Sequence, residues 1–193
     1  MILKIYMSNR VAKIILGLTG PLASGKSTVT DYLKEKHSAT IYKFSTPLRD
    51  ILDRIYIEQS RKNLQDLSLD LRNRFGDDLL ASITANDVKR DKDNSIIIVD
   101  GVRRLPDIKY LRQLPEFKLI SIETDQKTRW KRMTMRGENV DDINKTFEQF
   151  QKDEQAEAEQ KITEVAKTAD FQVNNNGTIE DLEEQVEKIL TRL

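Results

Sequence analysis

The fold is decided by Gly20-Pro21-Leu22-Ala23-Ser24-Gly25-Lys26-Ser27, a stretch that satisfies the pattern G-x-x-x-x-G-K-[ST]. The short apolar run 13–19 precedes it and predicts a strand buried on both faces, and residues 27–36 predict a helix. Glycines between a strand and a helix allow consecutive backbone N–H groups to turn inward around a phosphate, at the positive end of the helix. The stretch therefore predicts a phosphate-binding loop.

Each residue type in the loop suits one part of a nucleoside triphosphate. Lys26 supplies a mobile charge that spans the β- and γ-phosphates, the Ser27 hydroxyl is placed to ligate Mg²⁺, and Thr28 can reach the α-phosphate. A second metal ligand is expected at Asp100, which ends the apolar run 96–99. The residues expected to bind ATP through the loop are Gly20, Ala23, Ser24, Gly25, Lys26, Ser27 and Thr28.

The composition limits the remaining possibilities. The 193 residues suffice for one domain, and 32 basic and 32 acidic residues give a net charge of zero, so no general attraction for nucleic acid or anionic membrane is expected. Cysteine is absent and no apolar run approaches the roughly 20 residues of a membrane span. We expect a cytoplasmic protein, with residues 1–10 as a frayed leader whose apolar core is too short for a secretory signal peptide.

Predicted strands alternate with predicted helices along the chain. Further strand-like runs lie at 40–44, 95–100, 117–122 and 170–173, and the run at 95–100, the most strand-like, is expected at the sheet centre. Helical spacing marks 61–75 and 77–89, while 148–167 has the composition of a solvated helix face. The alternation predicts an α/β fold with a parallel sheet covered on both faces.

Basic residues near the loop favour a kinase over a switch or motor. Arg103 follows the expected Mg²⁺ ligand and can grip an acceptor phosphate with both guanidinium nitrogens. Phe44 and Arg49 follow the second strand, at the carboxyl edge of the sheet, where Phe44 can stack on a base and Arg49 can hold the acceptor. A buried Phe44 and a solvated Arg49 are the alternative.

Three more arginines are spaced i, i+3, i+7. Arg129, Arg132 and Arg136 share one face of a predicted helix, where they can stabilise charge on the transferred group. A basic solvated face is the alternative. A guanine-specific GTPase is disfavoured because the stretch at 144–147 lacks the aspartate of an N-K-x-D motif.

In order along the chain, the phosphate loop, Asp100-Gly101-Val102-Arg103, residues 129–137 and Asn174-Asn175-Asn176-Gly177 resemble the P-loop small-molecule kinases. The resemblance is to their nucleoside monophosphate kinase-like and dephospho-coenzyme A kinase-like group. It implies a three-layer P-loop NTPase fold in one domain, 1–193, with a five-stranded parallel sheet in a core of 11–44, 93–127 and 168–193. It also implies a helical acceptor-binding region at 45–92, a short lid at 128–140, and Asn175 and Gly177 near the adenine.

The acceptor remains open among three alternatives. A ribose hydroxyl benefits from a carboxylate base, which dephospho-coenzyme A kinases carry just after the second strand, whereas Lys43-Phe44-Ser45 stands there in this chain. We therefore favour a nucleoside or deoxynucleoside monophosphate, with dephospho-coenzyme A as the first alternative and a non-kinase NTPase as the second. The expected catalytic residues are Lys26, Arg103, Arg132 and Arg136, in a monomer or homodimer.

Overall fold

The computed structural model describes residues 13–136, 143–154 and 157–193. The expected leader, 1–10, and the part of the expected lid at 137–140 lie outside these ranges. Within them, no helix has the length and apolar character needed to span a bilayer. The described residues include five strands, all parallel, in one sheet. They are β1 (Ile14–Thr19), β2 (Thr40–Lys43), β3 (Ile96–Asp100), β4 (Phe117–Glu123) and β5 (Phe171–Asn174).

The strand order is β2-β3-β1-β4-β5, so the strand that leads into the phosphate loop is the central one. The expectation that residues 95–100 form the centre is wrong by one position. Strands flank β3 on both sides and helices cover both of its faces, so Ile97 and Val99 are fully buried. This full burial gives β3 the continuous apolar sequence of a central strand. Leu18 of β1 is in register with Asp100 of β3. The carboxyl ends of these two strands therefore meet at one edge.

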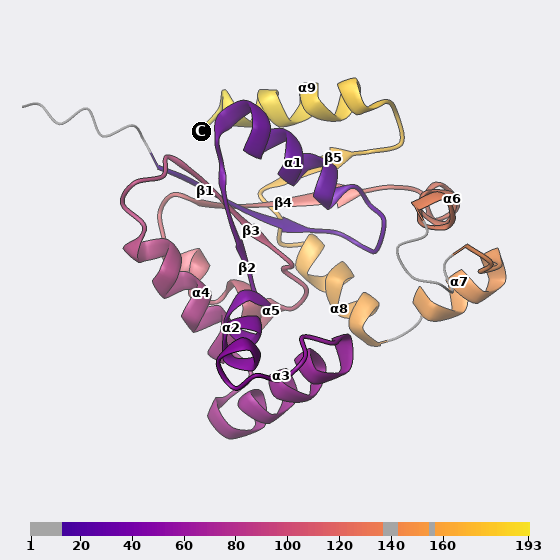
Figure 1. Cartoon of the computed structure of the whole chain (residues 1–193). Helices are drawn as coiled ribbons and strands as arrows, with labels where there is room; N and C mark the ends of the chain where they lie inside the picture. Colours follow the sequence, from indigo (N-terminus) through magenta and orange to yellow (C-terminus); the bar gives the residue numbers. More distant parts are fainter. Residues whose placement is uncertain (1–12, 137–142, 155–156) are drawn as a thin grey trace, which may run out of the picture.

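Helices cover both faces of the sheet (Figure 1). On one face, α1 (Lys26–His37) and α9 (Ile179–Leu190) pack against Leu16 and Leu18. On the other face, Ile15 belongs to a second apolar cluster, as the alternation of side chains along a strand requires. The helices of that second face are α2 (Thr46–Arg54), α3 (Arg61–Phe75), α4 (Leu79–Arg90), α5 (Leu105–Ile108) and α8 (Glu157–Ala166).

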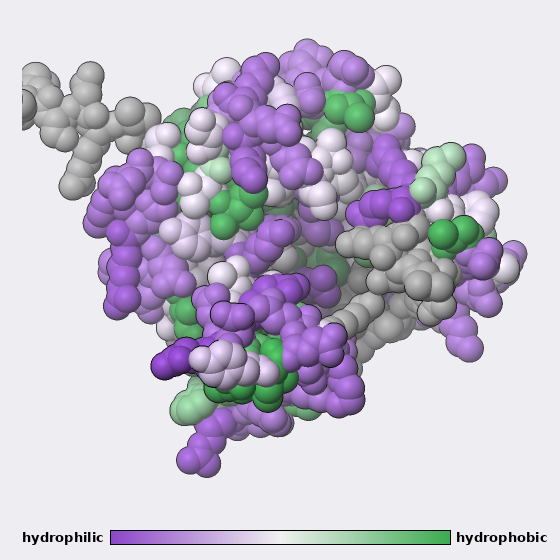
Figure 2. Space-filling model, in the orientation of Figure 1, coloured by the Kyte–Doolittle hydropathy of each residue, from purple (hydrophilic) through white to green (hydrophobic). Residues whose placement is uncertain are grey.

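The expected helical region at 45–92 consists of α2, α3 and α4, which form one end of the molecule (Figure 1). A 3-10 turn, η1 (Leu111–Gln113), follows α5, and α6 (Gln126–Arg136) and α7 (Phe147–Glu154) lie beyond β4. The face seen in Figure 2 is mainly hydrophilic, with its apolar residues in small separate spots.

Candidate nucleotide site

The phosphate loop is the turn between β1 and α1. Gly25 is the residue that precedes α1, with φ of 103°, and Gly20 has φ of 151°. Both angles lie in the region that favours glycine, whose lack of a Cβ removes the steric penalty. The first N–H groups of α1 have no earlier turn to bond, so they face the space that the loop encloses. The backbone geometry is that of an anion-binding loop.

Contacts from distant segments explain why the loop needs glycine. The Asn175 side chain, which is 5% exposed, donates from Nδ2 to the Ser24 carbonyl oxygen at 2.8 Å. A Cβ on Gly25 would stand 2.0 Å from that same Nδ2, and a Cβ on Gly20 would stand 2.6 Å from the Ile122 carbonyl oxygen. The Thr124 hydroxyl also donates to the Ser24 carbonyl, at 2.9 Å. The loop is thus held by β4, by the turn after β4 and by the turn after β5.

A cavity of about 510 Å³ lies in front of the loop. Arg132 and Arg136 of α6 line it, as do Arg103 and Asn175. Among the described residues, Ser24 Oγ and Arg132 Nη1 are buried and have no hydrogen-bond partner. A buried polar atom without a partner is costly, and both residues line this cavity. We call this the donor cavity.

Lys26 lies across the loop. Its Nζ donates to the carbonyl oxygens of Gly20 at 2.6 Å and Pro21 at 2.9 Å. The side chain lines both the donor cavity and a neighbouring cavity of about 800 Å³, and so does Ser27. These two residues therefore stand at the boundary between the two spaces. We call the larger one the acceptor cavity.

Two residues expected to hold a metal ion line the acceptor cavity. The Ser27 hydroxyl and the Asp100 carboxylate line the acceptor cavity together with Lys26. In the part of the chain that the structure describes, no group of three or more His, Cys, Asp or Glu side chains could hold a metal alone. Mg²⁺ characteristically takes one or two protein oxygens and completes its shell with phosphate and water. Ser27 and Asp100 fit that requirement.

The turn after β3 is fixed by hydrogen bonds. The Thr19 hydroxyl donates to the Val102 carbonyl at 3.0 Å, and Asp107 Oδ2 accepts the N–H groups of Arg103 and Arg104, each at 3.0 Å. Gly101 has φ of 94°, and a Cβ at this position would stand 3.9 Å from the Phe44 ring. This turn positions Arg103 where its side chain lines both cavities. Asp100 lines the larger of these cavities as well, and the role expected of Arg103 beside a metal ligand stays a prediction.

The expected acceptor residues come together in the acceptor cavity. Phe44, Arg49 and Arg103 all line it. Phe44 is only 9% exposed and also belongs to the core, while Arg49 Nη1 donates to Gln59 Oε1 at 3.1 Å. Four cations of this cavity were not singled out in the sequence: Lys43, Arg72, Arg104 and Lys161. Lys161 was overlooked because residues 148–167 have the composition of a solvated face, although Ile162 and Val165 of the same helix are buried.

Two expected ATP ligands have other surroundings in the structure. Arg129 does not share the cavity of Arg132 and Arg136: it is 7% exposed, donates to the Thr124 carbonyl and pairs with Glu154. Helical spacing put the three arginines on one face, but α7 covers the part of that face nearest the start of α6. A Cβ on Gly177 would stand 2.5 Å from Asp181 Oδ2, so Gly177 makes room for the cap of α9. Neither residue lines the donor cavity.

Solved structures share the fold. The shikimate kinase from Bacteroides thetaiotaomicron superposes with a TM-score of 0.60 at 14% identity, covering 92% of this chain and 98% of that one. The shikimate kinase from Acinetobacter baumannii in complex with shikimate has a TM-score of 0.56 at 14% identity, covering 94% and 95%. At these identities the likeness concerns the fold alone. The chain thus has an α/β P-loop kinase-like fold.

Sequence relatives extend over nearly the whole chain. A UPF0200 protein from Hyperthermus butylicus is 28% identical over 94% of this chain and 95% of its own length. A UPF0200 protein from Methanocaldococcus jannaschii is 28% identical over 93% and 90%. The family model described as AAA domain (AAA_18) matches residues 16–179, from β1 to the start of α9. Because this match spans most of the chain, the protein belongs to that AAA-domain family of P-loop proteins.

Proposed function

We propose that the chain transfers the γ-phosphoryl group of Mg·ATP to a nucleoside or deoxynucleoside monophosphate. The observation that carries the proposal is the pair of adjoining cavities at one edge of the sheet, with Lys26, Ser27 and Arg103 lining both. In-line phosphoryl transfer requires a donor and an acceptor held end to end with the charge between them neutralised. Two cavities with cationic residues at their boundary supply that arrangement.

The charges of the acceptor cavity support an anionic acceptor. Lysines and arginines outnumber carboxylates in its lining, and the carboxylates are Asp100 and Asp107. Asp107 Oδ2 already accepts two backbone N–H groups, and Asp100 is the expected metal ligand. An acceptor phosphate is itself an anion, so it needs cations for positioning rather than a base. The cations of the lining are Lys26, Lys43, Arg49, Arg72, Arg103, Arg104 and Lys161.

The rest of the lining suits a nucleobase. Phe44, Leu48 and Leu64 provide aromatic and aliphatic surface, and Gln59 and Gln65 add side-chain amides. Ligand sites of this kind combine apolar walls with a few polar groups that fix orientation. A base that stacks on Phe44 while its phosphate points toward Arg103 would fill the cavity.

The proposed mechanism depends on charge and position. Ser27 and Asp100 would hold Mg²⁺, which would supply neutralisation of the charge on the phosphate oxygens. Lys26 exchanges its bonds to the Gly20 and Pro21 carbonyls for phosphate oxygens. Arg132, whose Nη1 has no partner among the described residues, and Arg136 stabilise the negative charge on the transferred group.

A panel of acceptors tests the proposal. The panel holds ribo- and deoxynucleoside monophosphates, dephospho-coenzyme A and shikimate, the last because shikimate kinases share the fold. Each is assayed with Mg·ATP for ADP release and for the phosphorylated product. We expect a nucleoside diphosphate from at least one monophosphate. ADP release that no acceptor changes would favour an NTPase, and a product from dephospho-coenzyme A or shikimate alone would reassign the acceptor.

A further inference from the structure

Arg129 lies beside the phosphate loop without lining the donor cavity. Its side chain belongs instead to a separate cavity of about 560 Å³, which also contacts Gly20 and Pro21 from the side of α7 and α8. At 7% exposure it is among the few buried charged side chains of the described residues. Burying a charge costs desolvation free energy, which its partners must offset. The partners of Arg129 therefore indicate its role.

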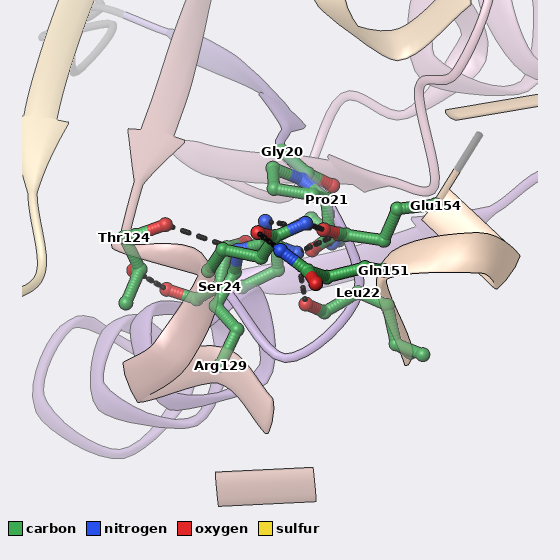
Figure 3. Close-up of polar contacts among 10 residues, drawn as sticks. Gly20, Pro21, Leu22, Ser24, Thr124, Arg129, Gln151 and Glu154 are labelled. Atoms are coloured by element: carbon green, nitrogen blue, oxygen red, sulfur yellow. Dashed lines mark hydrogen bonds and ion pairs between the residues drawn. The ribbon is translucent and has the colours of Figure 1, made fainter. Parts of the chain in front are cut away.

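The Arg129 guanidinium connects three segments (Figure 3). Its Nε donates to the Thr124 carbonyl at 3.0 Å, at the end of β4, and Nη1 donates to the Leu22 carbonyl of the phosphate loop at 3.3 Å. Nη1 and Nη2 both bond to the carboxylate of Glu154, on α7, with Nη2 to Oε2 at 3.0 Å. The guanidinium also lies over the Phe150 ring, 5.5 Å from its centre. All three of its nitrogens are therefore occupied by protein.

Glu154 is held in turn by its neighbours. Gln126 Nε2 donates to Glu154 Oε2 at 2.7 Å, and Gln151 Nε2 donates to Gln126 Oε1 at 3.0 Å. The carboxylate thus fixes the plane of the Arg129 guanidinium through both terminal nitrogens. A bidentate pair of this kind adds directional specificity as well as energy.

These contacts fix two carbonyl groups of the phosphate loop. Arg129 bonds the Leu22 carbonyl, while Thr124 and Asn175 bond the Ser24 carbonyl. A peptide whose carbonyl is fixed on the outer side of a loop has its N–H directed to the inner side, since the peptide group is planar. Donors fixed in advance need no reorganisation when an anion arrives.

From these contacts we propose that Arg129 and Glu154 form a positioning pair that preorganises the phosphate loop from α7, and that Arg129 does not touch the nucleotide. The inference rests on the donor half of the proposed function and assigns Arg129 a role different from those of Arg132 and Arg136. Glu154 lines neither the donor cavity nor the acceptor cavity. Its effect on nucleotide affinity is therefore exerted through Arg129.

The test compares Glu154→Gln with Glu184→Gln, a control that alters an exposed pair with Lys188 on α9. For Glu154→Gln we expect about tenfold weaker Mg·ATP binding by calorimetry, and faster hydrogen exchange in the peptide covering residues 20–25 of the nucleotide-free chain. The KM of the acceptor stays unchanged. The control matches the wild type in every readout.

A second variant tests the pair if Glu154→Gln does not fold. Arg129→Lys retains the charge and loses the planar fork, and it should weaken ATP binding and loosen the loop in the same direction. In the double variant the two fold-losses of ATP affinity should not multiply, because Arg129 and Glu154 act as one unit. Wild-type ATP affinity and exchange in both single variants, or effects that multiply, would overturn the pair. A wild-type chain that binds no ATP would instead overturn the proposed function.

Discussion

Asn175 and Ser24, which are 151 positions apart in the chain, meet through a 2.8 Å hydrogen bond from the Asn175 amide to the Ser24 carbonyl. The bond places the turn after β5 directly against the phosphate loop. It also explains the glycine that follows Ser24, since a side chain at position 25 would occupy the place of the Asn175 amide. The shape of the donor cavity therefore depends on a contact between the two ends of the domain.

Gly25→Ala should damage nucleotide binding more than it damages the fold. The added Cβ would stand 2.0 Å from Asn175 Nδ2 at a φ of 103°, so the loop must move. We expect at least about tenfold weaker Mg·ATP binding by calorimetry. Gly76→Ala is a matched control, because Gly76 also has φ of 103° but its Cβ would meet only Asp78 Oδ1, at 3.4 Å. Equal ATP affinity in the two variants would contradict the account.

Asp100→Asn should change the magnesium requirement. The amide removes the negative charge that the metal needs beside Ser27, so the Mg²⁺ concentration at half-maximal rate should rise at least about tenfold. The measurement is a Mg²⁺ titration of ADP formation at saturating ATP. An unchanged requirement would remove Asp100 from the metal site.

Asp107→Asn is the control for that titration, because Asp107 lines the same cavity but its carboxylate accepts hydrogen bonds from backbone N–H groups. Replacing the carboxylate that accepts the N–H groups of Arg103 and Arg104 should cost about 1–3 kcal/mol of unfolding free energy. Denaturant unfolding should show that loss while the magnesium requirement stays at the wild-type value.

Arg103→Ala should act mainly on the acceptor. Because the variant loses a charged hydrogen-bond donor at the boundary of the two cavities, the KM for the acceptor should rise about tenfold or more. Initial rates with varied acceptor and varied ATP separate the two substrates. Arg112→Ala, which removes an ion pair with Asp170 away from both cavities, should change neither KM. An effect on ATP alone would assign Arg103 to the donor.

Glu187 links α9 to α1 and should contribute a pH-dependent part of the stability. Hydrogen bonds from Tyr32, at 2.5 Å, and then from His37 lower the pKa of Glu187 below its usual value of 4.5. A carboxylate with a lowered pKa stabilises the fold fully above the unfolded value and loses that effect as pH falls. Glu187→Gln should therefore cost about 1 kcal/mol near pH 7, and the difference should shrink below pH 4.5.

The exposed Glu184 of the same helix supplies the comparison. Its pair with Lys188 leaves both side chains more than half exposed, so Glu184→Gln should be nearly neutral at every pH. Urea unfolding at pH 7 and pH 3.5 measures both variants. A constant difference for Glu187→Gln across this range would show that its effect is not electrostatic.

Local patterns were enough to predict most of the fold. The apolar runs and the helical spacing predicted all five strands, and the expected helix at 61–75 has the observed limits of α3. The position of β3 in the sheet was missed, because β1 and β3 are equally buried and burial does not reveal strand order. Strand order depends on pairing between distant segments, which a local pattern does not record.

The parts of the candidate site that could be predicted are those whose residues are adjacent in the sequence. The loop from Gly20 to Ser27 and the turn from Asp100 to Arg103 are contiguous, so their residues could be named. The surroundings of Arg129 were not predicted, because helical spacing does not show that Glu154, 25 positions later, lies against it. Lys161 was missed because the sequence of a highly charged helix does not show which of its charged residues line a cavity.

Phosphoryl transfer by this chain is measured directly by the transfer of label from [γ-³²P]ATP to a nucleoside monophosphate in the presence of Mg²⁺. We expect labelled nucleoside diphosphate with the wild-type chain, and none with Lys26→Ala, whose fold is checked by circular dichroism. Label found only in inorganic phosphate across all ribo- and deoxynucleotide acceptors, or labelled diphosphate formed equally by Lys26→Ala, would contradict it.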